Sequence, residues 1–380
     1  MLLAPEARLA WRREAVRAAM AERGLDAFVV THLPNLRYLT NLTASAGVVV
    51  VTARVTCLLV DFRYNAAVEQ LLRSGAVPSD TVLVPVPASY DEALATLLED
   101  GFGPRVGFEA AHLTVKRHTW LTARLAAAGR IDLVPTEGLV ESARLIKDEH
   151  EQAILREAAR RLSGVARSVL AEGLRPGPTE REVAAAIDCR LGRAGFERPA
   201  FETIVASGPN SALPHARPGD RRLATGDLVV LDFGGVYGGY CVDLTRTVAV
   251  GPPSSEARRL YRAVVDAQEA AFAVIRAGVS TAEVDRAARD ALGGYGLAEA
   301  FGHSTGHGLG LEVHEDPRVG APRPEGPAPT PLAPGVVITV EPGVYVPDLG
   351  GVRLEDDVLV TATGYERLTD VPREERLLTS

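Results

Sequence analysis

The chain has 380 residues, of which 46% are hydrophobic, and this length and composition predict two domains with full-sized cores. The formal net charge of −8 argues against nucleic acid as the main partner. The three cysteines, Cys57, Cys189 and Cys241, form neither a CxxC motif nor a disulfide framework, so a cytoplasmic location is expected.

Predicted strands and helices alternate over the first 142 residues. Apolar, β-branched runs predict strands at 25–31, 47–51, 55–61, 81–85, 105–108 and 131–135, and periodicity predicts helices at 7–24, 64–74, 88–98 and 114–128. Residues 34–40 are interpreted as a turn segment. The alternation predicts an α/β domain with a mixed sheet, residues 1–142. Its scattered Asp61, Arg63 and His112 are expected to be structural or surface residues.

Nothing in this first domain is typical of a signal peptide or a membrane span. Charged residues begin at Glu6, which leaves no long apolar region at the start. The longest apolar run, around Val48–Val60, contains threonine and arginine and is too short for a bilayer. We therefore expect no membrane partner.

The second domain is predicted to comprise residues 143–380. A linker at 143–148 precedes a long amphipathic helix from Glu149 to about Glu172. An internal repeat follows.

The repeat is visible in two helix starts and two strand starts. Thr179 with Glu182, and Ser280 with Glu283, have capping-box spacing, and each pair begins a predicted helix. The tetrapeptides Leu-Ala-Thr-Gly and Leu-Ala-Pro-Gly then each precede an apolar strand that ends in a carboxylate. Each half is therefore predicted to be two helices followed by a hairpin.

The first predicted hairpin carries two aspartates. A tight turn at Tyr237-Gly238 would place Asp232 opposite Asp243 on otherwise apolar strands. Opposed acids repel unless a cation lies between them, and a divalent metal is the simplest candidate. The alternative is that one aspartate merely caps the turn.

The second hairpin repeats the acidic pair. A turn centred on Asp348 would place Glu341 opposite Glu355. Packing the two halves about a pseudo-two-fold axis would gather four carboxylates, whose charge two divalent metals would compensate.

Four histidines beside glycine or proline turns could complete such a site: His215, His303, His307 and His314. For a single buried histidine, a structural role in the core is the alternative. Oxygen-rich ligation with one histidine suits Mn, Co or Fe(II) as well as Zn, so the metal is not determined.

Six motifs occur together in the second domain: Leu231-Asp232-Phe233-Gly234, Asp243-Leu244-Thr245-Arg246-Thr247, Gly306-His307-Gly308-Leu309-Gly310, Val313-His314-Glu315, Glu341-Pro342-Gly343 and Arg353-Leu354-Glu355-Asp356. In combination they resemble the pita-bread metallopeptidase family, which includes methionine aminopeptidase, aminopeptidase P, prolidase and the metal-free creatinase. The resemblance covers almost the whole chain. It implies an α/β creatinase-like domain followed by an α+β pita-bread catalytic domain with an internal pseudo-two-fold repeat.

The resemblance also implies a dinuclear metal site with all five ligand positions present. Asp232 would bind one metal, and His307 and Glu341 would bind the other. Asp243 and Glu355 would bridge both.

Further roles follow from the same resemblance. His215 and His314 would orient the substrate carbonyl and handle protons at the scissile bond. His303 would line a proline pocket, and Arg353 would lie beside the site. Glu341, next to the attacking water, would pass its proton to the proline nitrogen.

Two arginines bear on the substrate. Arg353 and Glu355 share a strand face, which suits an arginine that supports a bridging carboxylate, with an ordinary ion pair as the alternative. Arg318 occupies a position where prolidases of similar size often carry an arginine for the free carboxylate of a dipeptide. The alternative is that Arg318 is a solvated loop residue.

Within the family, creatinases have lost acidic ligands that this chain retains, and methionine aminopeptidases usually lack the preceding α/β domain. A metallopeptidase that cleaves Xaa–Pro bonds is therefore expected, with a dipeptidase favoured and an aminopeptidase P acting on Xaa-Pro-Yaa peptides as the alternative. Hydrolysis of a non-peptide amide and a non-catalytic binding module are further alternatives. The family implies a homodimer, and whether residues 321–334 gate the site stays open.

Overall fold

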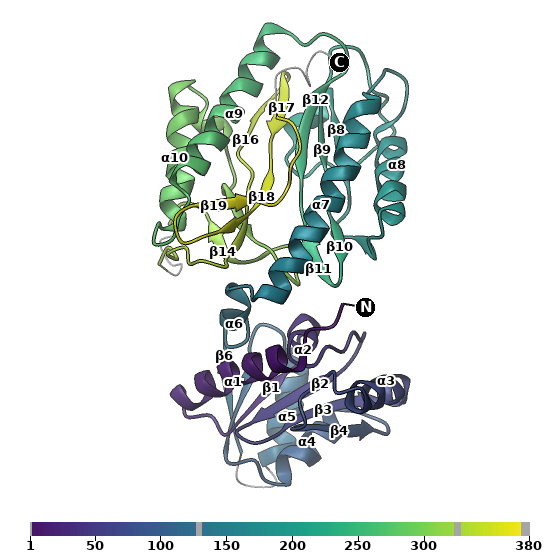
Figure 1. Ribbon diagram of the computed structural model, residues 1–380, viewed down its shortest axis with the longest axis vertical. Coiled ribbons are helices and arrows are strands. Elements are labelled where there is room, and N and C mark those ends of the chain that lie inside the picture. The colour runs from purple at the N-terminus through teal and green to yellow at the C-terminus, as the bar shows by residue number, and fades with distance from the viewer. Residues whose placement is uncertain (1, 127–130, 323–327, 374–380) are drawn as a thin grey trace. The chain divides into compact units, whose positions relative to one another are not determined.

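The computed structural model describes residues 2–126, 131–322 and 328–373, and the chain divides into two compact units, Met1–Arg144 and Leu145–Ser380 (Figure 1). The division falls within the predicted linker because a short helix, α6 (Glu141–Leu145), extends the first unit. In that helix the buried Arg144 donates from Nη1 to Oδ1 of Asn35 over 2.7 Å.

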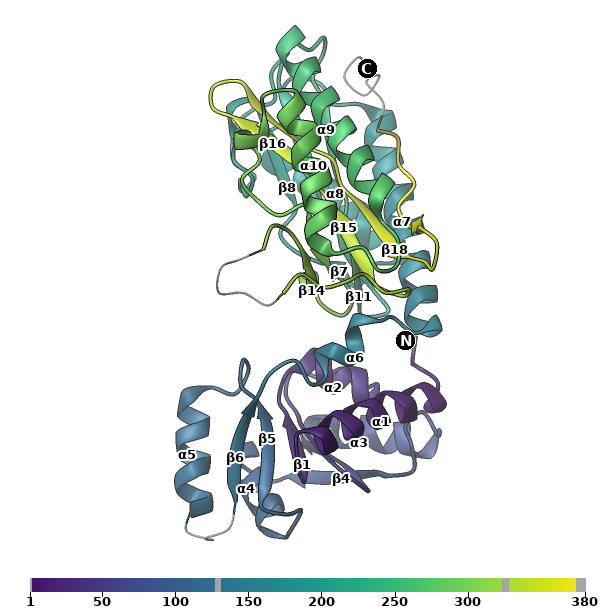
Figure 2. The same ribbon diagram turned by 90° about the vertical axis from the view of Figure 1, so that its left-hand side faces the viewer.

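The first unit contains a six-stranded sheet in the order β4-β3-β2-β1-β5-β6 (Figure 2). Its strands are β1 (Ala27–Val30), β2 (Val48–Thr52), β3 (Thr56–Asp61), β4 (Thr81–Val86), β5 (Arg105–Glu109) and β6 (Asp132–Thr136), with helices α1 (Glu6–Glu22), α2 (Leu33–Thr40), α3 (Phe62–Arg73), α4 (Tyr90–Glu99) and α5 (Val115–Ala126). β1 pairs antiparallel with β2 and parallel with β5, which confirms the predicted mixed sheet.

The segment interpreted as a turn is in fact the helix α2. Proline is tolerated in the first helical turn, where its missing N–H has no partner to lose, and Pro34 stands there. Asn41 then ends the helix with a left-handed φ of 60°. A single proline was therefore not a helix breaker at this position.

The second unit contains four long helices and several small sheets. The helices are α7 (Glu149–Glu172), α8 (Glu180–Arg193), α9 (Ser255–Val274) and α10 (Thr281–Gly294), and the strands are β7 (Arg198–Pro199), β8 (Ile204–Ser207), β9 (Leu228–Asp232), β10 (Gly235–Tyr237), β11 (Tyr240–Val242), β12 (Thr245–Ala249), β13 (Gly306–Gly308), β14 (Glu315–Val319), β15 (Val337–Val340), β16 (Gly343–Val346), β17 (Gly350–Arg353), β18 (Asp356–Val360) and β19 (Tyr365–Arg367). Short 3-10 helices cover Gly208–Ala212 and Ala298–Ala300. Among the described residues, no helix is long and apolar enough to cross a membrane.

The internal repeat is confirmed in the local geometry of the helix starts. Both predicted capping boxes form, with Thr179 capping α8 and Ser280 capping α10. Each cap residue also makes an isolated antiparallel bridge at the equivalent place, Thr179 with Arg222 and Ser280 with Pro331. The two halves thus join their helices to the following strands in the same way.

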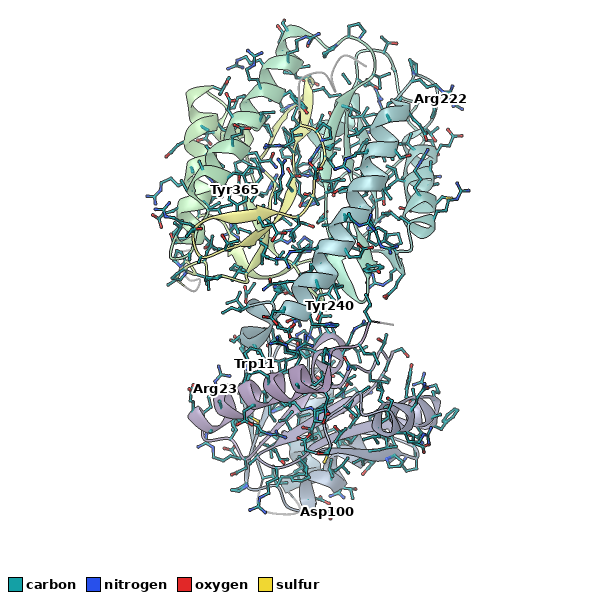
Figure 3. The ribbon with its side chains drawn as sticks, viewed as in Figure 1. Trp11, Arg23, Asp100, Arg222, Tyr240 and Tyr365 are labelled. Atoms are coloured by element: carbon teal, nitrogen blue, oxygen red, sulfur yellow. The ribbon has the colours of Figure 1, made fainter. Side chains whose placement is uncertain are left out.

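Apolar helix faces pack on the strands that lead to the acidic residues. In the second half, Val264 of α9 and Leu292 of α10 are fully buried in one cluster with Ile338 of β15 and Val358 of β18. In the first half, the hydroxyl of Tyr240 on β11 donates to Glu151 Oε1 of α7 over 3.0 Å (Figure 3).

The predicted register of the first hairpin was wrong. Its turn is Gly238-Gly239, with φ of 57° and 83°, rather than Tyr237-Gly238. Two left-handed turn residues suit the twist of a two-residue hairpin loop, and glycine adopts them without strain. As a result Asp232 lies opposite Thr245, and Asp243 lies in the break between β11 and β12.

The register of the second hairpin was predicted correctly. Gly343 pairs with Arg353 in β16–β17, and Val340 pairs with Asp356 in β15–β18. Asp348 has a left-handed φ of 65° within the turn. Glu341 and Glu355 therefore occupy corresponding positions where one pair of strands passes into the next.

Candidate metal centre

Five predicted ligand residues lie together in the second unit. Asp243, His307 and Glu355 offer ligand atoms that are all within 4.8 Å of one another. Glu341 is adjacent, with its Oε1 3.4 Å from Nε2 of His307. Asp232 is close enough to Asp243 for its charge to act on that carboxyl group. Asp232 ends β9 and His307 is the central residue of β13. Asp243, Glu341 and Glu355 lie in the breaks that follow β11, β15 and β17.

The carboxylates destabilise one another's charged forms. Burial and then the charge of Asp232 raise the pKa of Asp243 well above its usual range. Burial and then Asp243 do the same to the pKa of Glu355. Burial raises the pKa of Glu341 to about 8, with Asp232 adding to it. Without a cation, the cluster therefore holds protons at neutral pH.

Two oxygens of the cluster have no protein partner. Among the described residues, Oδ1 of Asp232 and Oδ1 of Asp243 are buried and accept no hydrogen bond. Unsatisfied buried oxygens are uncommon and call for an explanation such as an ion. The donor set of oxygens with one imidazole fits divalent metal ions.

Neighbouring groups orient these ligands. Thr245 donates from Oγ1 to Glu355 Oε2 over 2.6 Å. Nδ1 of His307 lies 3.0 Å from the Gly308 carbonyl, which leaves Nε2 facing Glu341. Burial and then His314 lower the pKa of His307 to about 4, so the ring is neutral and can bind a metal at neutral pH.

Arg353 connects the acidic cluster to the predicted proline pocket. It donates from Nη2 to Oδ2 of Asp232 and from Nη1 to the Tyr345 hydroxyl over 2.7 Å. Nε2 of His303 lies 2.9 Å from the same hydroxyl. The sequence reading missed Tyr345, although the correctly predicted hairpin register puts it on the same strand face as Gly343, the partner of Arg353.

His314 lies beside the acidic cluster, and its ring centroid is 4.3 Å from that of His307. Burial lowers the pKa of His314, while the charge of Asp232 opposes this shift. His215 is exposed, in a segment where the Pro214 carbonyl accepts a bond from Arg353 over 3.2 Å.

A buried glutamate that the sequence reading missed holds the loop of His215. Glu180 accepts from the amide and hydroxyl of Ser207 and from the amide of Gly219. It also accepts from Nδ2 of Asn210. These donors stand on both sides of His215 in the chain, so Glu180 ties together the two ends of its loop.

Arg318 is on β14, and its Nη1 donates to the carbonyl of Ala321 over 2.8 Å. Because Ala321 begins the stretch 321–334, this bond anchors the loop where it leaves the strand. The open question of whether the stretch gates the site falls partly on 323–327, outside the described residues.

Gly306 allows two strands to approach closely beside His307. A Cβ there would lie 2.0 Å from the Thr339 carbonyl oxygen of the neighbouring strand. We expect Gly306→Ala to destabilise the fold by about 1–3 kcal/mol, because overpacking moves backbone rather than a flexible side chain.

Thermal and urea unfolding would measure this loss. The matched control is Gly164→Ala in the middle of α7, where nothing lies within 4 Å. That control should be stabilised by about 0.5–1 kcal/mol through helix propensity. Equal effects of the two substitutions would contradict the close approach.

A second group with metal-ligand chemistry lies in the first unit and comprises His32, His112 and Glu141. The two rings are stacked with centroids 3.6 Å apart and planes 8° apart. Imidazole binds metals in its ring plane, so one ion cannot lie in both planes. This arrangement is unsuited to a metal as it stands.

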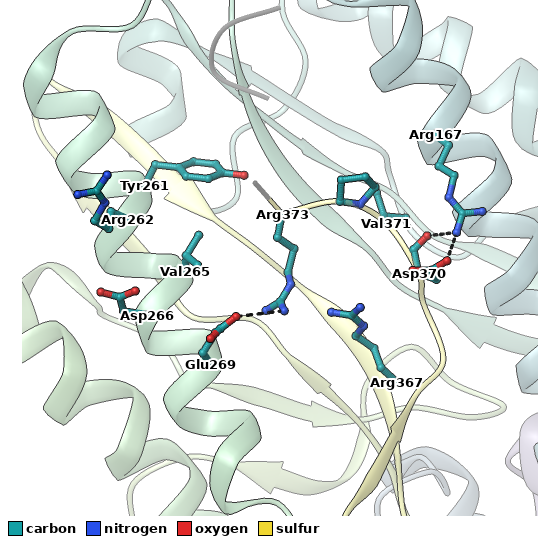
Figure 4. Close-up of a pocket in the computed structure, with 11 residues that line it drawn as sticks. Arg167, Tyr261, Arg262, Val265, Asp266, Glu269, Arg367, Asp370, Val371 and Arg373 are labelled. Carbon is teal, nitrogen blue, oxygen red and sulfur yellow. Dashed lines mark hydrogen bonds and ion pairs between the residues drawn. The ribbon is translucent and has the colours of Figure 1, made fainter. Parts of the chain in front are cut away.

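An open cavity of about 680 Å³ lies on the second unit between α9 and the segment 367–373 (Figure 4). Two of the four arginines that line it form ion pairs, Arg167 with Asp370 and Arg373 with Glu269. None of the predicted site residues is among the described residues that line it.

Comparison with known proteins gives two family-level matches. The model of "Metallopeptidase family M24" matches residues 153–362, and that of the "Creatinase/Prolidase N-terminal domain" matches residues 12–146. An Xaa-Pro dipeptidase of Pyrococcus horikoshii is 34% identical over 357 residues, covering 93% of this chain and 95% of the relative.

Solved structures of this size share the fold. The Xaa-Pro dipeptidase from Bacillus anthracis is 37% identical with a TM-score of 0.88, covering 96% of this chain and 99% of that one. The X-Pro aminopeptidase from Thermotoga maritima is 31% identical with a TM-score of 0.83, covering 95% and 98%.

Proposed function

This chain belongs to metallopeptidase family M24, and on that premise we propose that it hydrolyses the peptide bond between an N-terminal residue and proline, with Xaa-Pro dipeptides as the favoured substrates. The observation that carries the proposal is the buried acidic cluster beside His307, in which two carboxylate oxygens accept no hydrogen bond among the described residues. An Xaa-Pro dipeptidase among the relatives supports the choice of bond.

We propose that the cofactor is a pair of divalent ions, Mn, Co or Zn. Asp232 would hold one ion, His307 and Glu341 would hold the other, and Asp243 and Glu355 would bridge them. When bound, the ions would acidify a water molecule and polarise the scissile carbonyl.

The protein's own residues would handle the proton and the substrate. Glu341, buried next to His307, would take a proton from the attacking water and deliver it to the proline nitrogen. His314 would hold the carbonyl oxygen as charge develops on it, with His215 assisting from its loop. His303, fixed by Tyr345, would line the proline pocket.

Arg353 would keep the Asp232 carboxylate in place, since its guanidinium bridges that acid and Tyr345. Arg318 would receive the free carboxylate of a dipeptide. Releasing it for that purpose requires exchanging its bond to the Ala321 carbonyl for a bond to substrate. Small proline-containing peptides are the proposed substrates. The proposed assembly is a homodimer and the proposed location is the cytoplasm.

The substrate choice is tested by comparing Xaa-Pro with Xaa-Pro-Yaa peptides in the presence of added Mn, Co or Zn. We expect dipeptides to be cleaved with the higher kcat/KM. Replacing Arg318 by methionine should raise KM for dipeptides while leaving longer peptides unaffected, because only a dipeptide presents its carboxylate beside proline. Comparable cleavage of tripeptides would instead indicate aminopeptidase P activity.

A further inference from the structure

Lys147 forms a buried ion pair with a residue beside the proposed site. Its ammonium is 2.7 Å from Oε1 of Glu315, and the two side chains are 1% and 9% exposed. Desolvating two charges costs free energy that a pair recovers only with good geometry. A buried pair is therefore weak evidence for a stabilising role. Its location beside the proposed site points to a role in positioning a site residue.

The backbone of Lys147 is held on both sides. Its amide donates to the Gly335 carbonyl over 2.9 Å, and its carbonyl accepts from Nε2 of Gln152 over 2.8 Å. The preceding Ile146 bridges to Val336, just before the strand β15 that ends beside Glu341. The ammonium thus projects from a segment with little freedom to move.

Glu315 is equally confined at the other end of the pair. It pairs with Gly308 where β14 meets β13. Its carboxylate occupies the space beside Gly310, where an added Cβ would lie 2.5 Å from Oε1 of Glu315. The carboxylate therefore packs under the tight connection, residues 308–315, that carries His314.

The residue before Glu315 is His314, the last residue of this connection before β14 begins. That ring lies against His307, with centroids 4.3 Å apart. Since Glu315 is anchored by Lys147, displacing its carboxylate would shift the connection and with it the His314 ring.

Resting on the proposed function, we propose that Lys147 is a positioning residue, which through Glu315 holds His314 in place for the substrate carbonyl. Among the described residues, the hydrogen-bond partners of its ammonium are Glu315 and the Leu145 carbonyl, and neither is a proposed metal ligand. Its effect is accordingly expected on turnover rather than on metal binding or substrate affinity.

The test is Lys147→Met, with Lys116→Met as the matched control. Lys116, the other lysine of the chain, is exposed on α5 of the first unit. We expect kcat of Lys147→Met to fall about 10–100-fold, as for other residues that orient an active-site group, with KM and metal content unchanged. The control should retain wild-type kcat.

A double variant separates positioning from stability. Lys147→Met combined with Glu315→Met removes both charges, so the folded state no longer contains an unpaired buried charge and thermal stability should recover. If Lys147 positions His314, kcat stays low in the double variant. Recovery of kcat together with stability would overturn the proposal.

Amide hydrogen exchange gives a readout that does not depend on substrate. Lys147→Met should speed exchange over residues 308–315 while leaving β9 and β12 unchanged, and unaltered exchange in that connection would overturn the proposal. If the wild-type protein fails to cleave any Xaa-Pro peptide, the proposed function fails, whereas this exchange result still decides the role of Lys147.

Discussion

Glu341→Gln is expected to lower kcat by about 10²–10⁴-fold while leaving the fold intact, because the amide cannot carry the proton from water to the leaving nitrogen. Its carboxyl group lies next to His307, and burial raises its pKa to about 8, so without bound metal it can hold a proton at neutral pH. Steady-state hydrolysis of an Xaa-Pro dipeptide measures the loss.

In the metal-free protein, the same substitution should raise thermal stability at high pH. A folded pKa of about 8, above the usual value of 4.5, means that the folded state binds the proton more tightly than the unfolded state. Stability from this group is present below about pH 4.5 and is lost as the pH rises through 8. Glutamine carries no such charge, so the variant should melt above wild type at pH 9 and close to it at pH 5.

The control is Glu14→Gln, on an α1 side chain that is 74% exposed. It should change neither kcat nor the difference in melting between the two pH values. A wild-type rate in Glu341→Gln would remove Glu341 from the mechanism.

Removing divalent metal with a chelator is expected to have the second large effect on activity. Activity should fall to background and return with Mn, Co or Zn. Burial raises the pKa of Asp243, Glu341 and Glu355 in the metal-free cluster, and the charges of neighbouring acids add to the shift of each group. Metal binding must therefore displace protons.

Protonation of the cluster is linked to folding stability, and the direction of the change with pH can be measured. Because a raised pKa favours the folded state only at low pH, Glu341 should cost the metal-free protein up to about 1.4 kcal/mol of stability per pH unit as the pH rises from about 4.5 to 8. Asp243 and Glu355 should act in the same direction. Metal at about 100 times its Kd should restore about 2.7 kcal/mol. Calorimetry in buffers of different ionisation enthalpy would detect the released protons.

Full activity after verified metal removal would contradict the metal centre. Asp243→Asn provides a check within the cluster, since it removes one coupled acid. The slope of stability against pH should become shallower in that variant, provided that it still folds.

The hairpins show how far local sequence rules reach. The register of the second hairpin followed from centring the turn on Asp348, and the pairing of β16 with β17 confirms it. The first failed because it placed Tyr237 at a turn position that needs a left-handed φ, whereas the neighbouring pair Gly238-Gly239 adopts that conformation without strain. The prediction that the acids gather nevertheless survived, since Asp243 lies in a break between strands rather than directly opposite Asp232.

Other site residues had no local signature. Glu180 precedes His215 by many residues, yet its carboxylate ties the ends of that loop. Lys147 and Glu315 meet across 168 positions of the chain. Tyr345 belongs to no motif, although the correct hairpin register already placed it near Arg353.

Periodicity, capping and turn chemistry act over a few residues, so the amino-acid sequence was enough to predict two units, the capping boxes, the repeat and the acids that belong to it. The folded chain was needed to show which oxygens lack hydrogen-bond partners among the described residues, how Arg353 joins Asp232 to Tyr345, and how Lys147 reaches Glu315. Those features depend on burial and on contacts between distant segments, and no local pattern encodes either.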